Sequence, residues 1–208
     1  QTKDHVLSRI RAGVLEAGTV DLLRQHGLAD RMDRDGMPKD GTRIFWEGKE
    51  DFWIDVIRWT GRRMMVWGQT QITEDLYAAR ERDRGEMIFE VENVALHDLD
   101  GAPSVTFDRH GDSQRIECDF IAGCDGFHGP SRMAIPADIR REYERVYPFG
   151  WLGIMVEKPP MKEIAYAYHS EGFAMASRRN PMLSRYYVQV PSTDKVEDWS
   201  DDRFWEAL

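Results

Sequence analysis

Residues 119–129 read Asp119-Phe120-Ile121-Ala122-Gly123-Cys124-Asp125-Gly126-Phe127-His128-Gly129. This pattern predicts a buried strand that ends on Asp125-Gly126, followed by a short turn of helix through Ser131 and Arg132. A carboxylate and a glycine would then lie at the C-terminal edge of a sheet, where α/β proteins bind cofactors. Asp-Gly is also an ordinary turn pair, so the stretch alone leaves both interpretations open.

The composition fits one large domain or two small ones. Of the 208 residues, 41% are hydrophobic and 11% aromatic, which is enough for real cores. Lys and Arg number 28 and Asp and Glu 37, so the net charge is −9. An acidic surface disfavours nucleic acid and anionic membranes as partners, and no stretch of the sequence approaches the roughly 20 apolar residues of a membrane span.

Cysteine and histidine usage predicts neither a disulfide nor a metal site. In one extended strand, Cys118 and Cys124 would lie roughly 20 Å apart, beyond disulfide reach. Two free thiols suit a reducing cytoplasm, and the six histidines show no spacing such as H-E-x-x-H. Ser200 predicts the start of a helix that has little room before Leu208, and the chain begins at Gln1. We therefore expect a fragment.

The first part of the chain reads as mixed helices and strands. The pattern predicts a helix over residues 12–25 that ends at Gly27, and a second helix over residues 74–82. It predicts strands over residues 42–46, 52–57, 64–67 and 87–91, and a hairpin formed by residues 105–108 and 115–123. No G-x-G-x-x-G occurs in the sequence, so motifs alone do not identify a dinucleotide-binding protein.

After Pro136 the composition and pattern of the sequence change. Strand-like segments rich in aromatic residues follow at 151–156, 164–169, 173–177 and 185–190. We interpret them as a mainly antiparallel sheet in a second domain. The predicted domains are residues 1–141 and 142–208, and residues 37–66 are candidates to pack with the second domain.

Two arginines alternate in the run Arg9-Ile10-Arg11-Ala12-Gly13-Val14, just ahead of the first predicted helix. Guanidinium groups bind phosphate, and a helix N-terminus attracts it through its partial positive charge. A solvated basic turn would explain the same run. Gln69, after Gly68 at a strand-to-helix junction, could bond a ligand or cap the turn.

A second candidate site lies in the run Ser177-Arg178-Arg179 and in the next strand. Alternate residues of a strand share a face, so Ser177 and Arg179 would point one way, and Arg185 and Tyr187 could face them. Arginine, serine and tyrosine converging on an apolar sheet would hold a small carboxylate. The alternative is a surface pair of strands with arginines lying over aromatic rings.

Three further residues are candidates on weaker grounds. A tyrosine in a pocket, such as Tyr166, can hydrogen-bond a phenol and favour its anion, although a core tyrosine is the commoner case. His128 and Arg132 flank the Asp125-Gly126 turn and could take a phosphate. A solvated helix start explains them as well.

Six runs carry a resemblance to a known family: residues 9–16, 67–70, 120–129, 144–153, 184–191 and 195–201. Together they closely resemble the 4-hydroxybenzoate 3-monooxygenase (p-hydroxybenzoate hydroxylase) family of flavoproteins. The similarity spans essentially the whole chain and covers about the middle half of a family member. It implies a mixed α/β (α+β) fold with a Rossmann-like FAD/NAD(P)-binding domain lacking its N-terminal βαβ unit, plus a mainly antiparallel substrate domain.

The resemblance also implies an activity. NAD(P)H would reduce FAD, and a flavin hydroperoxide formed with O2 would hydroxylate 4-hydroxybenzoate to 3,4-dihydroxybenzoate. It further implies a homodimer in the cytoplasm with a small aromatic acid as substrate. The alternatives are a flavin hydroxylase of another hydroxybenzoate and a non-catalytic fragment that binds an aromatic acid.

Site roles follow from the matching motifs. The run Arg9 to Val14 and Gln69 resemble FAD contacts, and Asp125-Gly126 an element shared by FAD and NAD(P)H. His128 and Arg132 resemble nicotinamide-cofactor contacts. By the same resemblance, substrate would be bound by Tyr166 at the phenol, by Ser177, Arg178, Arg179 and Tyr187 at the carboxylate, and by Arg185 near the flavin.

The chain departs from the family pattern in several places. The G-x-G-x-x-G unit is absent. Lys39 replaces a histidine of the family's proton relay, which puts the proton path in question. His5 replaces a tyrosine near the cofactor 2′-phosphate, which leaves the choice between NADPH and NADH open.

Overall fold

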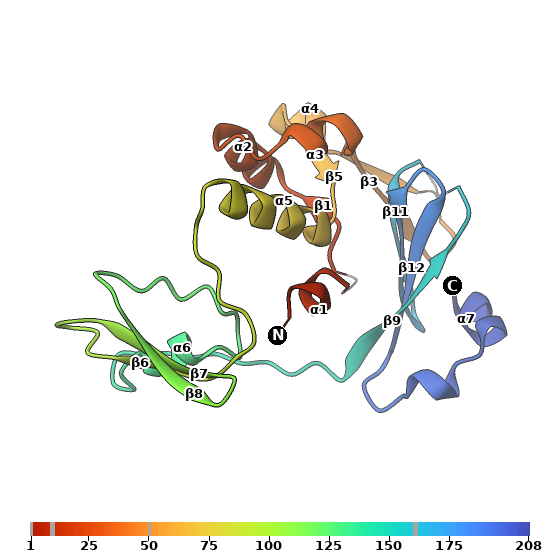
Figure 1. Cartoon of the computed structure of the whole chain (residues 1–208). Coiled ribbons are helices and arrows are strands. Elements are labelled where there is room, and N and C mark those ends of the chain that lie inside the picture. Colours follow the sequence, from red (N-terminus) through yellow and green to blue (C-terminus); the bar gives the residue numbers. More distant parts are fainter. Residues whose placement is uncertain (1, 9–10, 50, 160–161) are drawn as a thin grey trace. The chain divides into compact units, whose positions relative to one another are not determined.

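The computed structural model describes residues 2–8, 11–49, 51–159 and 162–208. The chain divides into two compact units, each with its own helices and strands (Figure 1). The smaller unit comprises residues 1–9 and 80–145, and the larger unit comprises residues 10–79 and 146–208. The mixed α/β (α+β) class predicted from the sequence is confirmed.

A small sheet and its helices form one part of the larger unit. Strands β1 (Val14–Leu15), β5 (Met64–Val66) and β2 (Met37–Lys39) pair antiparallel in the order β1-β5-β2. The helices are α2 (Ala17–Gln25), α3 (Asp30–Asp35), α4 (Val56–Thr60) and the first turns of α5 (Gln69–Arg82). The core of this part consists of Leu15, Val20, Leu23, Ala29, Met32, Met65 and Trp67.

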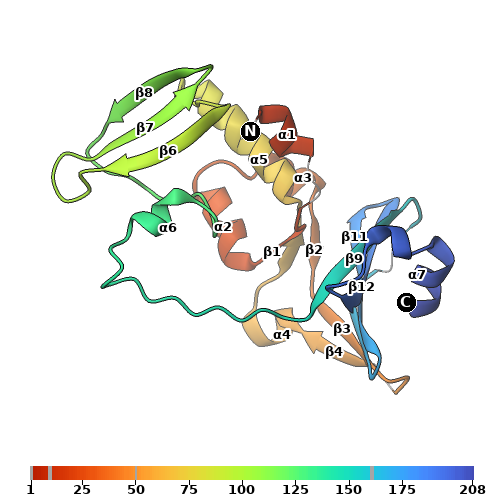
Figure 2. The ribbon, with the colours of Figure 1, turned by 90° about the horizontal axis from the view of Figure 1, so that it is seen from below.

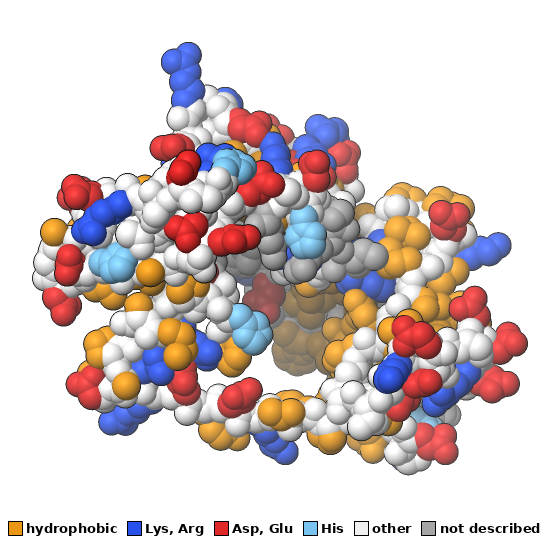
Figure 3. Space-filling view, turned by 60° about the horizontal axis from the view of Figure 1, so that its bottom comes forward, with side chains coloured by type: hydrophobic (Ala, Val, Ile, Leu, Met, Phe, Trp, Pro, Cys, Tyr) orange, Lys and Arg blue, Asp and Glu red, His pale blue; other side chains and the backbone are white. Residues whose placement is uncertain are grey.

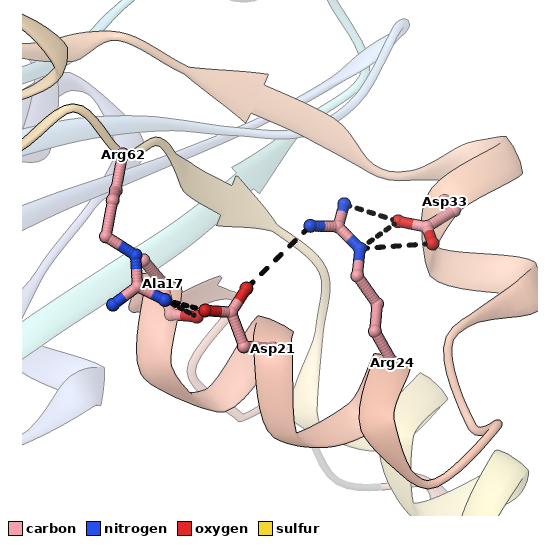
Figure 4. A network of polar contacts seen from close by, with 5 residues as sticks. All are labelled: Ala17, Asp21, Arg24, Asp33 and Arg62. Atoms are coloured by element: carbon pink, nitrogen blue, oxygen red, sulfur yellow. Dashed lines mark hydrogen bonds and ion pairs between the residues drawn. The ribbon is translucent and has the colours of Figure 1, made fainter.

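Ion pairs join α2 to its neighbours (Figure 4). Arg24 donates from Nε and Nη2 to the carboxylate of Asp33 in α3, at 3.0 and 2.7 Å. Arg62 pairs with Asp21 and donates to the carbonyl of Ala17 at 3.3 Å. Exposed pairs of this kind contribute only about 0–1 kcal/mol each, so they orient α2, and the apolar core stabilises it.

A six-stranded sheet forms the other part of the larger unit. Its strands are, in spatial order, β4 (Phe52–Asp55), β3 (Gly41–Trp46), β10 (Ile164–His169), β11 (Gly172–Asn180), β12 (Leu183–Pro191) and β9 (Phe149–Val156). All neighbours pair antiparallel except β3 and β10, which are parallel. Residues 41–46 and 52–55 therefore pair within the same sheet as the strands that follow residue 148.

One face of this sheet is covered by α7 (Asp201–Ala207), which lies beside β12 in both ribbon views (Figures 1 and 2). Phe204 of α7 packs on Ala174, Val188 and Val190. The short 3-10 helix Val196–Asp198 precedes α7. Ser200 caps α7 by accepting from the N–H of Arg203 at 3.2 Å. The candidate site lies on the opposite face of the sheet.

The smaller unit contains a three-stranded antiparallel sheet of β6 (Val91–His97), β7 (Ser104–Arg109) and β8 (Asp112–Glu117). The predicted hairpin forms as β7 and β8 and turns at His110-Gly111, where both residues have positive φ. The unit also contains α1 (Lys3–Ser8) and α6 (Pro130–Ala134).

The predicted strand that ends on Asp125-Gly126 does not form. Strand β8 ends at Glu117, and residues 118–125 belong to no strand of the described sheets. A strand needs a neighbour for its backbone hydrogen bonds, and Phe120 is 92% exposed. The short helix after it is confirmed as α6. Cys118 and Cys124 are free thiols, but they do not share a strand.

Other predicted boundaries shift for local reasons. Residues 14–15 pair as β1, so the first helix begins at Ala17 and not at residue 12. The strand predicted over 52–57 stops at Asp55, whose carboxylate accepts from the N–H of Arg58 at 3.0 Å and starts α4. Helix α5 begins at Gln69, before the predicted residue 74. The strand predicted over 87–91 is wrong, because residues 87–90 form no strand and β6 runs from Val91 to His97.

Acidic and basic side chains are interspersed over the face drawn in Figure 3, with hydrophobic side chains exposed among them. Across the described residues, no helix has the length and apolar character needed to cross a membrane. Nor do His, Cys, Asp and Glu side chains gather there in a group that could hold a metal ion.

Candidate active site

The register of β10, β11 and β12 brings Tyr166, Ser177, Tyr187 and Arg185 to one sheet face, and Arg178, which pairs with Ser184, alternates to the other. Ser177 pairs with Arg185. Met175 lies between Tyr166 on one side and Tyr187 on the other. Because side chains alternate along a strand, these residues point away from the face that α7 covers. The convergence predicted from alternation alone is therefore present in the sheet.

A second segment, residues 11–14, runs alongside residues 66–69. The N–H of Trp67 donates to the carbonyl of Gly13 at 3.1 Å, and the N–H of Gln69 donates to Ala12 at 2.9 Å. These bonds continue the β1–β5 ladder up to the start of α5. Two runs that are separated by about fifty residues in the sequence are thus fixed side by side.

The two arginines of β11 and β12 reach this segment. Arg185 donates from Nη1 to the carbonyl of Arg11 at 3.1 Å. The guanidinium of Arg179 lies against Gly13 so closely that a Cβ atom there would stand 1.6 Å from Nη1. It also lies beside Gly68, where a Cβ would be 3.1 Å from Nη2. The structure therefore brings the predicted cofactor segment and the predicted carboxylate site together.

This junction holds positive charge without a matching anion. Within the described ranges, four buried polar atoms of the junction have no hydrogen-bond partner: Ser177 Oγ, Arg179 Nη1, Arg185 Nε and, beside Gly68, Gln71 Oε1. Burial lowers the pKa of Arg179, the nearby Arg185 lowers it further, and Tyr187 opposes the shift. Both effects disfavour the charged guanidinium, so an anion that accepted from Arg179 would relieve them.

Tyr187 is held flat against β9. It lies opposite Gly153, where a Cβ would stand 2.4 Å from Cε1 of the ring. The guanidinium carbon of Arg185 is 5.0 Å from the centre of the same ring. Tyr166 is half-buried, and its ring packs at 5.8 Å from Phe173. The tyrosines and the arginines therefore line a single sheet face with an aromatic surround.

Lys39, at the end of β2, is buried, with 6% of its surface exposed. Its ammonium donates to the carbonyl of Lys162, just before β10. A hollow of about 360 Å³ adjoins it, lined by Pro38, Lys39, Asp40, Arg43, Trp53, Lys162 and Glu163. Neither Gly13 nor Gly68, against which Arg179 lies, lines this hollow.

The Asp125 turn lies in the smaller unit. Asp125 accepts from the N–H of Ser131 at 2.9 Å, which holds the pKa of its carboxyl below the usual range. A Cβ at Gly129 would stand 2.0 Å from Cγ of Asp125, and Gly126 has φ +74°, so the turn requires both glycines. The carboxylate thus caps α6.

The remaining predicted residues have local partners. Arg132 pairs with Glu142 at 3.3 Å and lies 4.0 Å over the ring of Phe127, which also contacts His128. Arg178 donates to the carbonyl of Asn180 at 3.4 Å. The side chain of Gln69 is exposed at the start of α5, and His5 is exposed in α1. Arg9 and Ile10 lie outside the described residues.

Comparison with known proteins identifies the family. A family model described as "FAD binding domain" matches residues 1–208. The chain belongs to the FAD binding domain family. It is 47% identical over 210 residues to the p-hydroxybenzoate hydroxylase of Acinetobacter baylyi, and the match covers all of this chain and 52% of that protein. The chain thus spans about half the length of this curated relative.

Solved structures that resemble this chain support the fold. The p-nitrophenol 4-monooxygenase PnpA of Pseudomonas putida matches with a TM-score of 0.74 and 12% identity, over 92% of this chain and 50% of that one. PqsL of Pseudomonas aeruginosa, solved in complex with 2-aminobenzoylacetate, matches with a TM-score of 0.71 and 18% identity, over 88% and 51%. At these identities the likeness establishes the fold alone.

The side chains at the junction suit FAD as the bound group of this FAD binding domain. A guanidinium (Arg11) and an amide (Gln69) lie on adjacent, backbone-bonded segments. Guanidinium suits a phosphate, and an amide can both donate to and accept from a hydrogen-bonding ring. Gly68 and Gly153, which leave room for Arg179 and Tyr187, could not be recognised from the sequence, because the sequence does not show which side chain packs against a glycine.

Proposed function

We propose that this chain is part of an FAD-dependent aromatic monooxygenase that hydroxylates 4-hydroxybenzoate to 3,4-dihydroxybenzoate with NAD(P)H and O2. The support is the 47% identity to p-hydroxybenzoate hydroxylase along the whole chain. Because the chain spans about half of that relative, the activity is proposed for the whole protein.

The observation that carries the proposal is the unmatched positive charge on the β10–β12 face. Arg179 Nη1 and Ser177 Oγ are buried without a partner within the part of the chain that the structure describes. Tyr187 shares the face with them. A benzoate carboxylate can accept from all three groups, and a buried guanidinium favours an anion over a neutral ligand. Arg178 is proposed as a neighbouring charge that adds to the attraction.

The opposite end of the substrate would lie toward Tyr166. A tyrosine hydroxyl that donates to the substrate oxygen stabilises the phenolate, and ionisation makes the ring carbon next to it more nucleophilic. Tyr166 and Tyr187 lie on either side of Met175 in the sheet register. Two tyrosines on one face, near an arginine pair, would thus orient a para-substituted phenol by both of its polar ends.

The cofactor would be held by residues 9–14 and Gln69. Bound FAD would supply the electron transfer from NAD(P)H and the activation of O2. Arg185 donates to the carbonyl of Arg11, so it would tie the cofactor segment to the substrate sheet. Asp125 and Gly126 are proposed contacts of FAD and NAD(P)H, and His128 and Arg132 of NAD(P)H. A homodimer and a cytoplasmic location are proposed from the resemblance, and a domain boundary near residue 142 from the change in sequence pattern after Pro136.

Flavin retention tests the proposal. The whole protein is incubated with FAD and desalted, and its visible spectrum is recorded with and without 4-hydroxybenzoate. A retained flavin band that shifts on addition of the acid is the expected result. If no flavin is retained but 4-hydroxybenzoate quenches the tryptophan fluorescence, the protein is instead a non-catalytic binder of an aromatic acid. A third possibility, another hydroxybenzoate as substrate, predicts a larger spectral shift with the 2- or 3-hydroxy isomer.

A further inference from the structure

Two glycines enclose the guanidinium of Arg179. Gly13 and Gly68 are both buried, and the tip of Arg179 fills the volume that a Cβ at Gly13 would need. Neither glycine has positive φ, so an L-residue could adopt the backbone conformation at both positions. The requirement for glycine at this place is therefore one of space and not of backbone freedom.

The backbone around these glycines is held in place from both sides. The bonds from Trp67 to Gly13 and from Gln69 to Ala12 flank the slot, and β1 and β5 continue the pairing behind it. Trp67 also belongs to the buried core of this part of the unit. The walls of the slot are thus more rigid than the long side chain that enters it.

We propose that Gly13 and Gly68 are positioning residues that form a slot for the Arg179 guanidinium and thereby set the selectivity of the site for a carboxylated phenol. The inference rests on the proposed function, because it concerns the same substrate end. In the slot, the Arg179 guanidinium is held near Arg185, and its Nη1 has no hydrogen-bond partner within the described ranges. Outside the slot, its charge would reach solvent and the site would lose its preference for an anion.

An added methyl group should displace Arg179 to a different extent at the two glycines. At Gly13, the atoms that a new Cβ meets are Nη1, Cζ and Nη2 of Arg179, so a methyl group must expel the guanidinium. At Gly68, the nearest atom is Oε1 of Gln71, at 2.1 Å, and Arg179 Nη2 follows at 3.1 Å. A flexible side chain can move in both cases, so both variants are compatible with the fold. Gly13→Ala should displace Arg179 more than Gly68→Ala does.

Equilibrium binding to the whole protein tests the slot. The ligands are 4-hydroxybenzoate and its neutral analogue 4-hydroxybenzamide, followed by tryptophan fluorescence. Gly13→Ala should weaken binding of the acid by about tenfold or more and that of the amide by less than about twofold, with Gly68→Ala between it and the wild type. Gly18→Ala is the control, because Gly18 lies exposed in α2 with nothing within 4 Å of its added Cβ.

A double-mutant cycle with Arg179→Ala separates this role from general damage. If the slot acts through Arg179, Gly13→Ala should have almost no further effect on acid binding once Arg179 is gone. Equal losses for acid and amide, or full additivity in the cycle, would overturn the inference. If Gly13→Ala does not fold, the same cycle with Gly68→Ala decides. A wild-type protein that does not bind 4-hydroxybenzoate would refute the proposed function itself, whatever the variants do.

Discussion

Ser177 of β11 lies directly opposite Arg185 of β12, and both side chains are buried on the sheet face that points away from α7. A serine hydroxyl and a guanidinium side by side in a sheet are both able to donate hydrogen bonds. Neither Ser177 Oγ nor Arg185 Nε has a partner within the described part of the chain. A ligand that accepts hydrogen bonds, such as a carboxylate, would therefore satisfy both groups on this sheet face.

Arg179→Met should separate ligand binding from stability. Removing the guanidinium should weaken binding of 4-hydroxybenzoate by about 2–5 kcal/mol, because the carboxylate would lose a buried charged donor. The same change should raise the free energy of unfolding of the ligand-free protein by about 1 kcal/mol, since a half-buried charge repelled by Arg185 is replaced by an apolar chain of similar length. Equilibrium dialysis and urea unfolding measure the two effects.

Arg58→Met is the matched control for that experiment, because Arg58 lies exposed in α4 over the ring of Trp59. It should change neither quantity by more than about 0.5 kcal/mol. If Arg179→Met bound the acid as tightly as the wild type, the carboxylate site would have to lie elsewhere.

Gly153→Ala should disturb the site through Tyr187. The new methyl group would stand 2.4 Å from Cε1 and 2.7 Å from Cδ1 of the ring, so the ring must leave β9. We expect binding of 4-hydroxybenzoate to weaken by about tenfold, or 1.4 kcal/mol. Gly150→Ala on the same strand is the control, since nothing lies within 4 Å of its added Cβ. Equal affinities of the two variants would argue against a role of Tyr187.

The strands of the six-stranded sheet could be predicted from the sequence because alternation and aromatic content persist along each of them. The segment 164–169 is confirmed to the residue, and the face shared by Ser177 and Arg185 follows from the same alternation. Side-chain period is a local property, so it survives without knowledge of the fold. The site roles assigned to these residues stay predictions.

The structure of two other segments could not be predicted from the local sequence pattern. Residues 12–15 carry the periodicity of the helix that follows, but their pairing with β5 decides their structure. The run before Asp125 has the apolar content of a strand, yet within the described residues no strand pairs with it. Both outcomes depend on a partner segment distant in the sequence, which single-sequence patterns do not specify.

Asp125→Ala should loosen the start of α6. The bonds from Ser131 lower the pKa of Asp125, so its contribution to stability is present above the unfolded pKa of about 3.9 and is lost as pH falls through the lower folded pKa. Hydrogen exchange of the Ser131 amide should be slowed at pH 6 in the wild type and fast in the variant. The exposed Asp138→Ala serves as control. Unchanged protection in Asp125→Ala would show that the cap does not hold the helix.

Lys39→Met should stabilise the protein at neutral pH. Burial lowers the pKa of Lys39; Glu163 opposes the shift, Arg178 and Lys162 add to it, and Asp40 opposes it. Because the folded pKa lies below the unfolded value of about 10.4, the cost of the buried ammonium is fully present at any pH below the folded pKa. Replacing it with an apolar chain of similar length should add about 1–2 kcal/mol to the free energy of unfolding at pH 7.

The pH dependence gives the sharper form of the Lys39 prediction. As pH rises from the folded pKa toward about 10.4, the wild type loses its proton from Lys39 and with it the cost, so the advantage of Lys39→Met should shrink. Urea unfolding at pH 7 and pH 10 measures the change, and Lys49→Met in the exposed β3–β4 turn should show no such trend. An advantage that stayed constant with pH would mean that Lys39 is destabilising through packing rather than through its charge. A variant less stable than the wild type at pH 7 would mean that the bond from Lys39 to the carbonyl of Lys162 outweighs the desolvation of the ammonium.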